Sequence, residues 1–157
     1  MADVLATNDS PLETAATILV VDDVDLVLNL VVSILKSAHY NVLHAHSGSE
    51  ALELAAQHDG KIDLLLSDVQ MPGMTGPMLG EELIKVRPAT HVMFMSAYLG
   101  GNMLVMNYGW AFLEKPFVAS RLLQMVNEVL ISPNRSQGTY KFDSREDTDR
   151  KKNDESL

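Results

Sequence analysis

The chain alternates short apolar runs with longer segments of helical periodicity, and no other sequence feature restricts the fold as strongly. From Thr17 onward each apolar run is four or five residues long, which suits a strand. Most runs lack regular polar alternation, which is typical of strands that are covered on both faces. The five expected strands are Ile18–Val21, Asn41–Ala45, Ile62–Leu66, Val92–Met95 and Trp110–Leu113.

Segments with apolar residues at helical spacing lie between and after these runs. In one of them Ser47 stands three positions before Glu50, a pattern typical of a capping box at the start of a helix. Strands separated by helices predict a doubly wound α/β fold, with a five-stranded parallel sheet between two helical layers. The five expected helices are Asp25–Ala38, Ser49–His58, Met78–Val86, a short piece at Gly101–Asn107, and Ala119–Leu130.

The length of 157 residues and the 46% hydrophobic content predict one globular domain, which we expect at residues 17–131. Residues 1–16 lack the basic start and apolar core of a secretory signal, so we expect a flexible segment and a cytoplasmic protein. No apolar stretch approaches the roughly 18 residues of a membrane span. Residues 132–157 are too polar to form a core, which leaves a disordered tail or a docking linker as alternatives.

The charge distribution argues against a nucleic-acid partner. The whole net charge of −9 lies in residues 1–131, which hold 6 basic and 15 acidic residues, whereas residues 132–157 hold 6 of each. An acidic body repels a phosphate backbone. The absence of cysteine further excludes disulfides, thiolate metal sites and cysteine nucleophiles.

Polar side chains follow four of the five expected strands. In a parallel sheet of this kind, functional groups gather beyond the carboxyl ends of the strands. Three carboxylates in one place repel one another unless a cation lies among them, and oxygen-only ligands favour Mg²⁺. The residues that we expect to converge are Asp22, Asp23, Asp68, Ser96 and Lys115.

This residue set predicts phosphoryl transfer. A carboxylate beside Mg²⁺ can attack phosphorus and form an acyl phosphate, and we assign this role to Asp68. Lys115 and Ser96 then neutralise and hydrogen-bond the phosphoryl oxygens.

Four motifs in order, ILVVDD, LLLSDVQMPGMTG, MFMSAY and FLEKPF, resemble the receiver domain of bacterial two-component response regulators over about residues 17–131. The resemblance implies a flavodoxin-like fold with strand order 2-1-3-4-5. It also implies that Asp68 is the phosphoacceptor and that Asp22 and Asp23 are the acidic metal pair. The backbone carbonyl of Gln70 would be a further metal ligand.

The resemblance has three further implications. Phe112 would be the aromatic residue that reorients on phosphorylation, although packing alone also explains an aromatic at this position. The Lys115–Pro116 bond would be cis. The phosphodonor would be a histidine kinase or a histidine phosphotransfer protein.

Two features differ from the family pattern. Thr75 stands before Gly76, where the family usually has an acidic residue, and we expect this change to affect only the loop. Ser96 and Lys115 are 19 residues apart, fewer than the family usually has, and the missing residues fall in the fourth helix. We therefore expect that helix to be short or irregular.

The first expected helix carries more apolar residues than one buried face requires. In the family this helix docks against the helical phosphodonor domain, so the resemblance implies donor docking by Val24, Val27 and Leu30. A dimer contact or deeper burial explains the same surplus equally well. His44 and His46, which alternate near the second strand, are expected to be ordinary surface histidines because no third ligand is nearby.

The leading functional hypothesis is a phosphoacceptor switch without an output domain that acts through contacts with a downstream protein. A Mg²⁺-dependent phosphohydrolase is the second hypothesis, disfavoured because Gln70 occupies the position where such enzymes commonly have their second aspartate. The third is a degenerate receiver that only binds partners. It is disfavoured because every residue that the chemistry needs is present.

Overall fold

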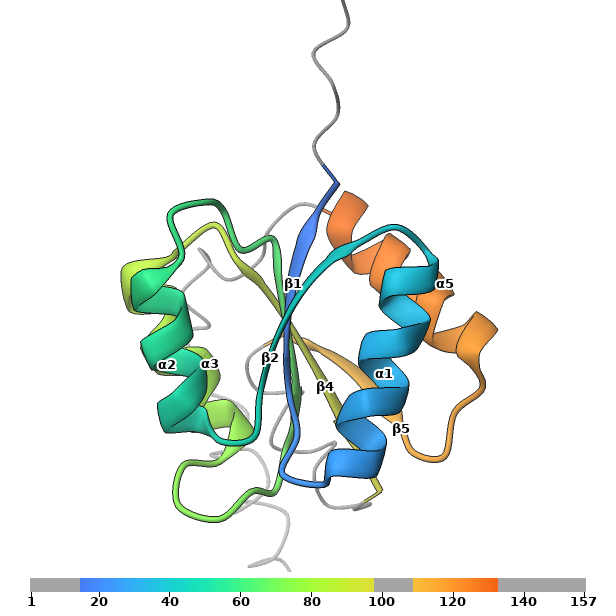
Figure 1. The fold of residues 1–157 in the computed structure, drawn as a ribbon, viewed down its shortest axis with the longest axis horizontal. Helices are drawn as coiled ribbons and strands as arrows, with labels where there is room; N and C mark the ends of the chain where they lie inside the picture. The colour runs from blue at the N-terminus through green and yellow to red at the C-terminus, as the bar shows by residue number, and fades with distance from the viewer. Residues whose placement is uncertain (1–14, 98–108, 133–157) are drawn as a thin grey trace, which may run out of the picture.

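Apolar segments form the strands of one parallel sheet in the computed structural model, which describes residues 15–97 and 109–132 (Figure 1). The strands are β1 (Thr17–Val21), β2 (Asn41–Ala45), β3 (Leu64–Asp68), β4 (His91–Ser96) and β5 (Ala111–Glu114). They are ordered β2-β1-β3-β4-β5 and pair in parallel throughout, as predicted.

Four helices in the described part of the chain cover the two faces of the sheet (Figure 1). They are α1 (Asp25–Ser37), α2 (Gly48–Gln57), α3 (Gly76–Val86) and α5 (Ala119–Ile131). Leu19 and Val21 belong to the core beneath α2 and α3, whereas Ile18 and Val20 belong to the core beneath α1 and α5. Because both faces of β1 are buried, its sequence is apolar without alternation.

The largest boundary differences from the sequence prediction, two residues each, are at both ends of β3 and at the start of α3, whereas the other described elements agree within one residue. β3 begins and ends two residues later than expected, because its ladder continues through Ser67 and Asp68, which pair with Phe94 and Met95. The pairing uses backbone groups and is indifferent to side-chain polarity. Helix α3 begins at Gly76 rather than Met78, because the side chain of Thr75 caps it.

Some predictions concern residues outside the described ranges. The helix expected at Gly101–Asn107 lies there, as do residues 1–14 and 133–157, so these expectations stay predictions. Among the residues that the structure describes, none of the helices has the length and hydrophobicity that a membrane crossing requires.

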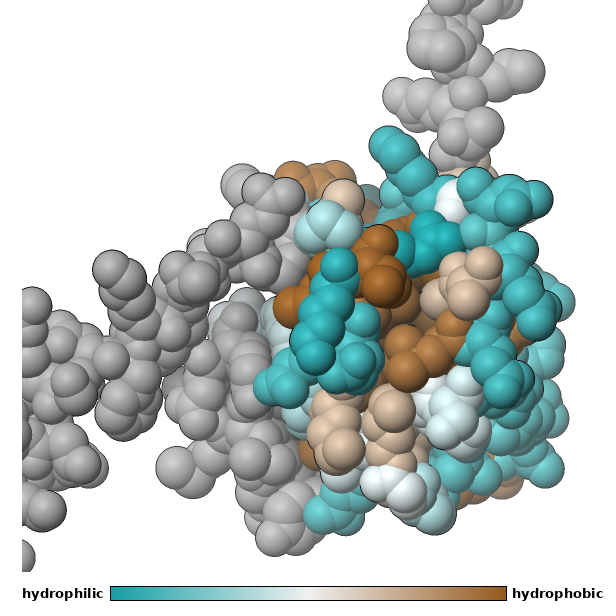
Figure 2. Space-filling model, turned by 90° about the vertical axis from the view of Figure 1, so that its left-hand side faces the viewer, coloured by the Kyte–Doolittle hydropathy of each residue, from teal (hydrophilic) through white to brown (hydrophobic). Residues whose placement is uncertain are grey.

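The surface of α2 and α3 has an apolar groove of about 490 Å³. Figure 2 faces these two helices and shows apolar side chains gathered between hydrophilic ones. Leu52, Ala55 and Val86 contribute apolar atoms to the groove, and Glu82 and Arg87 contribute charged ones.

Candidate functional site

Three aspartates meet at the carboxyl edge of the sheet. β1 ends immediately before Asp22 and Asp23, and Asp68 is the last residue of the adjacent strand β3. One carboxylate oxygen from each of the three lies within 4.8 Å of the others. Within residues 15–97 and 109–132, no other group of three acidic, histidine or cysteine side chains is this close. The predicted convergence of the three carboxylates is therefore present.

Asp22 is completely buried and is held on both sides. Its Oδ1 accepts a hydrogen bond from the backbone N–H of Val24 at 2.9 Å, and its Oδ2 accepts one from Lys115 Nζ at 2.9 Å. Its own N–H donates to the carbonyl of Ala45 at 3.3 Å, which ties the loop after β1 to the end of β2. A buried carboxylate needs such partners, because burial disfavours its charged form.

Lys115 lies between two of the carboxylates. Its Nζ is 2.9 Å from Asp22 Oδ2 and 3.5 Å from Asp68 Oδ2, and its side chain is only 16% exposed. Its backbone N–H donates to the carbonyl of Ser96 at 2.9 Å, which continues the pairing of β5 with β4. The Lys115–Pro116 bond is cis, as the sequence resemblance implies.

The environment of Asp68 disfavours its charge. Burial raises the pKa of its carboxyl group above the usual range, and the neighbouring Asp22 carboxylate raises it further. Lys115 and the backbone N–H of Val69 act in the opposite direction without cancelling the increase. The carboxylate of Asp68 is thus poorly solvated, and its negative charge is only partly neutralised by Lys115. Carboxyl groups with such a shifted pKa are common at functional sites.

The loop after Asp68 contains two residues whose importance the sequence prediction missed. A Cβ at Gly76 would lie 2.1 Å from the Asp68 carbonyl oxygen, so only glycine permits this approach. The Gly76 N–H donates to the Val69 carbonyl at 2.9 Å and closes the loop. Thr75 Oγ1 accepts from the Met78 N–H at 3.3 Å, so threonine keeps the capping function of an acidic residue. The glycine at the end of the LLLSDVQMPGMTG motif was the available signal.

The other predicted site residues lie near this cluster or beside it. Ser96 is buried at the end of β4, one position beyond Met95, the register partner of Asp68. Phe112 is half-buried on β5 and packs against the core under α2 and α3. Gln70 is exposed two residues after Asp68. The ligand role of the Gln70 carbonyl and the switch role of Phe112 remain predictions.

The exposed surface of α1 matches the surplus of apolar residues in its sequence. Val24 is 48% exposed, Leu30 56% and Leu26 80%. Val27, by contrast, packs partly against the core under α1 and α5. Deeper burial therefore does not account for the surplus at Val24 and Leu30.

The two histidines near β2 are exposed, as expected of surface residues. His46, however, contacts Asp25 and Glu50, with its Nε2 2.6 Å from Asp25 Oδ1 and its Nδ1 3.6 Å from Glu50 Oε2. These contacts across the sequence were not predicted.

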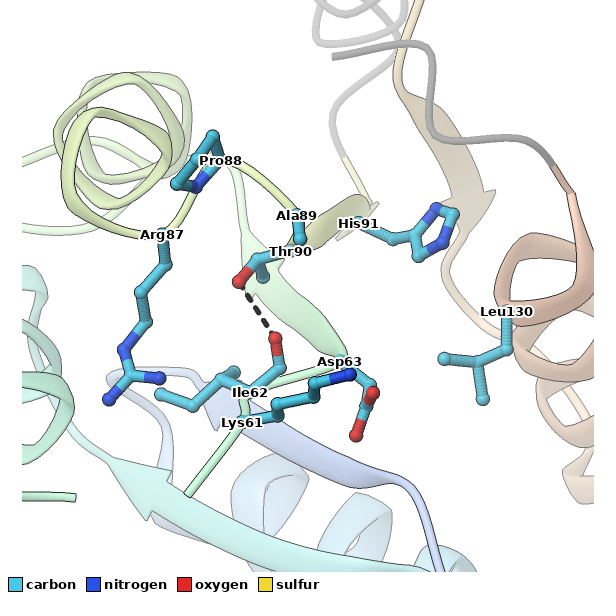
Figure 3. A pocket seen from close by; sticks show the side chains of 9 residues that line it. All are labelled: Lys61, Ile62, Asp63, Arg87, Pro88, Ala89, Thr90, His91 and Leu130. Atoms are coloured by element: carbon cyan, nitrogen blue, oxygen red, sulfur yellow. Dashed lines mark hydrogen bonds between the residues drawn. The ribbon is translucent and has the colours of Figure 1, made fainter. Parts of the chain in front are cut away.

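A second hollow of about 260 Å³ lies at the opposite, amino edge of the sheet (Figure 3). Two of its charged residues, Asp63 and Arg87, form hydrogen bonds with backbone atoms. Asp63 Oδ2 accepts from the Thr17 N–H at 2.8 Å, and Thr90 Oγ1 donates to the Ile62 carbonyl at 2.7 Å. Arg87 donates to the carbonyls of Ala55, His58 and Gly60 at 2.7 to 2.9 Å.

The carboxyl-edge cluster fits a hard divalent cation. Its donors are carboxylate oxygens, without nitrogen or sulfur, and such donors suit Mg²⁺. Lys115 contacts two of the three carboxylates, Asp22 and Asp68, so a further positive charge would balance the cluster.

Comparison with known proteins agrees with this architecture. The family model described as "Response regulator receiver domain" matches residues 18–127. The chain belongs to the response regulator receiver domain family.

Three similar proteins illustrate the relationship. Sensor kinase CckA of Brucella abortus (strain 2308) is 39% identical over 122 residues, which cover 76% of this chain and 13% of CckA. The crystal structure of the receiver domain of hybrid histidine kinase CckA matches with a TM-score of 0.64 and 37% identity, covering 73% of this chain and 99% of that one. Response regulator TrrA of Thermotoga maritima, crystallised with Mg²⁺ and BeF, gives a TM-score of 0.65 at 26% identity, covering 73% and 98% of the two chains.

The curated relatives are much longer than the matched region. The chain spans 13% of CckA and 26% of the Escherichia coli (strain K12) transcriptional regulatory protein GlrR, to which it is 33% identical over 118 residues. The likeness therefore establishes a receiver domain of the kind found in response regulators and hybrid kinases.

Proposed function

We propose that this receiver domain is a phosphoacceptor switch that takes a phosphoryl group onto Asp68. The observation that carries the proposal is the position of Lys115 Nζ, 2.9 Å from Asp22 and 3.5 Å from Asp68, at the edge of a three-carboxylate cluster. A carboxylate suited to act as acceptor, an acidic pair and a cation thus lie at one edge of the sheet. That combination suits phosphoryl transfer better than a structural ion pair.

The transfer itself needs few groups from the protein. A carboxylate oxygen of Asp68 bonds to phosphorus, the bond from phosphorus to the donor atom breaks, and the donor leaves with the bonding electrons. Lys115 is placed to contact a phosphoryl oxygen, because its Nζ already lies next to Asp68. Ser96, at the end of the neighbouring strand, would donate a hydrogen bond to another phosphoryl oxygen.

Mg²⁺ would be held by Asp22, Asp23, Asp68 and the backbone carbonyl of Gln70. When bound, it would neutralise charge on the phosphoryl oxygens. The raised pKa of Asp68 supports this assignment. Burial and the neighbouring Asp22 carboxylate disfavour its ionised form, and a bound cation would stabilise that form. The solved TrrA structure, which contains Mg²⁺ and BeF, is consistent with it.

A switch differs from a turnover enzyme in its behaviour after the transfer. We infer that the domain catalyses only its own phosphorylation and dephosphorylation, in the cytoplasm. Phe112 would reorient in the phosphorylated state, and the output would be a contact with a downstream protein rather than with nucleic acid or membrane. The net charge of −9 fits a protein partner better than nucleic acid.

The donor would be a histidine kinase or histidine phosphotransfer protein that docks on α1. Val24, whose N–H donates to Asp22, and Leu30 on α1 are exposed apolar residues, and Leu26 on the same helix is exposed as well. Val27 is a weaker candidate because it packs partly against the core. Replacing Leu26 and Leu30 with serine should slow transfer from the cognate donor but not labelling by a small phosphodonor. Equal losses with both donors would refute the docking role.

The phosphoacceptor proposal is tested by incubating the chain with Mg²⁺ and acetyl phosphate and measuring the intact mass. We expect one phosphoryl group on the wild type, none on Asp68→Asn, and none on the wild type when EDTA replaces Mg²⁺. Rapid multiple turnover without a persistent adduct would favour the phosphohydrolase instead. An unmodified wild type would refute the switch.

A further inference from the structure

The segment that joins β2 to the start of α2 provides no predicted ligand, yet His46 and Gly48 contact residues near Asp23 and in the loop after Asp68. Its residues 46 and 47 lie between the end of β2 at Ala45 and the start of α2 at Gly48. On one side His46 contacts Asp25, two residues after Asp23. On the other side Gly48 approaches Met74, in the loop that follows Asp68.

The contact with the first loop is short. His46 Nε2 lies 2.6 Å from Asp25 Oδ1, in the first turn of α1. Asp22 is fixed by the Ala45 carbonyl and the Val24 N–H, so the loop is held before and after Asp23. Asp23 is exposed between these two points of attachment. Its position relative to Asp22 therefore depends on how firmly Asp25 is held.

His46 is itself held from its own side of the contact. Its backbone N–H donates to Glu50 Oε2 at 3.1 Å, and its Nδ1 lies 3.6 Å from the same oxygen. Ser47 Oγ accepts from the Glu50 N–H at 3.2 Å, which fixes the start of α2. Glu50 thus holds the backbone of His46 at the start of α2. From this position the imidazole of His46 reaches Asp25 of α1.

The contact with the second loop depends on a glycine. A Cβ at Gly48 would lie 2.7 Å from the Met74 Sδ and 2.8 Å from the Met74 Cβ. Because the second atom is next to the backbone, rotation of the Met74 side chain alone would not relieve the overlap. The start of α2 and the loop after Asp68 are therefore packed at a distance that only glycine allows.

We propose that the segment joining β2 to the start of α2, through His46 and Gly48, is a positioning element that sets the spacing between the two loops of the magnesium site. This inference rests on the proposed function, since it assumes that Asp22, Asp23 and Asp68 bind Mg²⁺. His46 and Gly48 act on these ligands indirectly, through Asp25 and Met74.

A simple charge effect predicts the opposite sign for His46. If the imidazole only added positive charge near three carboxylates, its removal would tighten binding of a divalent cation. If it positions the loop, its removal weakens binding. A single exposed contact stabilises one geometry modestly, so we expect His46→Ala to raise the Mg²⁺ dissociation constant about twofold to fivefold.

The test measures Mg²⁺ affinity by calorimetry for the wild type, His46→Ala and the control His44→Ala, which removes another exposed histidine of the same region. Hydrogen exchange of the metal-free proteins provides a second readout. We expect faster exchange at residues 22–25 in His46→Ala and at residues 69–76 in Gly48→Ala, with wild-type behaviour in His44→Ala.

Failure of the inference and failure of the proposed function give different results. If the wild type does not bind Mg²⁺, the proposed magnesium site is wrong. If the wild type binds it but His46→Ala binds as tightly as His44→Ala, or more tightly, the positioning role is overturned. Unchanged exchange at residues 69–76 in Gly48→Ala would overturn the role of the second contact.

Discussion

The two edges of the sheet use charged side chains in opposite ways. At the amino edge, Asp63 and Arg87 each bind backbone groups of neighbouring segments at 2.7 to 2.9 Å. At the carboxyl edge, Asp22 and Asp68 both contact Lys115, and Asp23 adds a third carboxylate. The charged side chains at the amino edge hydrogen-bond backbone groups of neighbouring loops. Those at the carboxyl edge form a cluster with more negative than positive charge.

The difference separates structural from functional polar residues. A charged side chain whose hydrogen bonds all go to backbone groups stabilises the fold and has no donor or acceptor available for a ligand. A cluster whose charges are not balanced is costly unless something outside the chain completes it. Similar residue types at the two edges therefore have different roles, and variants at matched positions can test this contrast.

The largest contrast is expected between two aspartates at opposite ends of β3. Asp68→Asn should abolish phosphorylation by acetyl phosphate, because the amide cannot form an acyl phosphate. Asp63→Asn should be labelled like the wild type, since its carboxylate lies at the amino edge and accepts from the Thr17 N–H. Phosphoprotein electrophoresis measures both. Loss of labelling in Asp63→Asn, in a protein that remains folded, would break the contrast.

The next largest effect is expected at Lys115. Lys115→Gln should slow phosphorylation by about 10² to 10³, the range for a lost charge-stabilising group at a reacting centre. It should not weaken Mg²⁺ binding, because removing a cation leaves the carboxylates less neutralised. Rapid-quench labelling and calorimetry measure the two effects. Lys61→Gln, an exposed lysine at the amino edge, is the control, and an equal loss there would contradict the role of Lys115.

Arg87 should affect stability rather than phosphorylation. Arg87→Met removes hydrogen bonds to three carbonyls and should lower the free energy of unfolding by about 2–3 kcal/mol. Lys85→Met removes an exposed ion pair on α3 and should lower the free energy of unfolding much less than Arg87→Met does. Urea unfolding measures both. Equal losses would show that the carbonyl contacts of Arg87 contribute no more than a surface charge.

Asp68 should reduce the stability of the metal-free protein at neutral pH. Its pKa is raised in the folded state by burial and by Asp22, so the folded protein binds the proton more tightly than the unfolded chain. That contribution is full at acid pH and is lost as pH rises through the folded pKa. Asp68→Asn should therefore be more stable than the wild type at pH 7 in EDTA, and this gain should vanish at acid pH. A less stable Asp68→Asn at pH 7 would contradict it.

The smallest effect is expected at His91, on the amino edge. Burial lowers the pKa of its imidazole, and Asp63 only partly opposes this shift. The unfolded chain then takes up the proton first as pH falls through about 6.5, so stability declines there. His91→Gln should have a shallower decline than the wild type in urea unfolding between pH 7.5 and 5.5. Superimposable profiles would contradict the prediction.

Local sequence pattern predicted much of the architecture. The run at Ile18–Val21 is apolar because both faces of β1 are buried, so its pattern indicated a strand inside two helical layers. The convergence of Asp22, Asp68 and Lys115 followed from the rule that parallel strands end at one edge. The helix at Gly101–Asn107 stays a prediction.

The remaining features depend on contacts that a linear pattern does not contain. The end of β3 was misplaced because hydrogen bonds of the ladder continue through polar residues such as Ser67. The contact of His46 with Asp25 requires the register in which Val21 lies beside Ala45. The approach of Gly76 to the Asp68 carbonyl depends on the path of the loop, so only the structure reveals why glycine is needed.

The unbalanced carboxyl edge should accept a phosphoryl group at one residue, Asp68. The sharpest test is to phosphorylate the wild type with acetyl phosphate and Mg²⁺ and trap the product with borohydride, which reduces an acyl phosphate to an alcohol. Peptide mass spectrometry then identifies the altered residue. We predict homoserine at position 68 alone. Modification at Asp22, Asp23 or Asp63 in place of Asp68 would contradict the phosphoacceptor role.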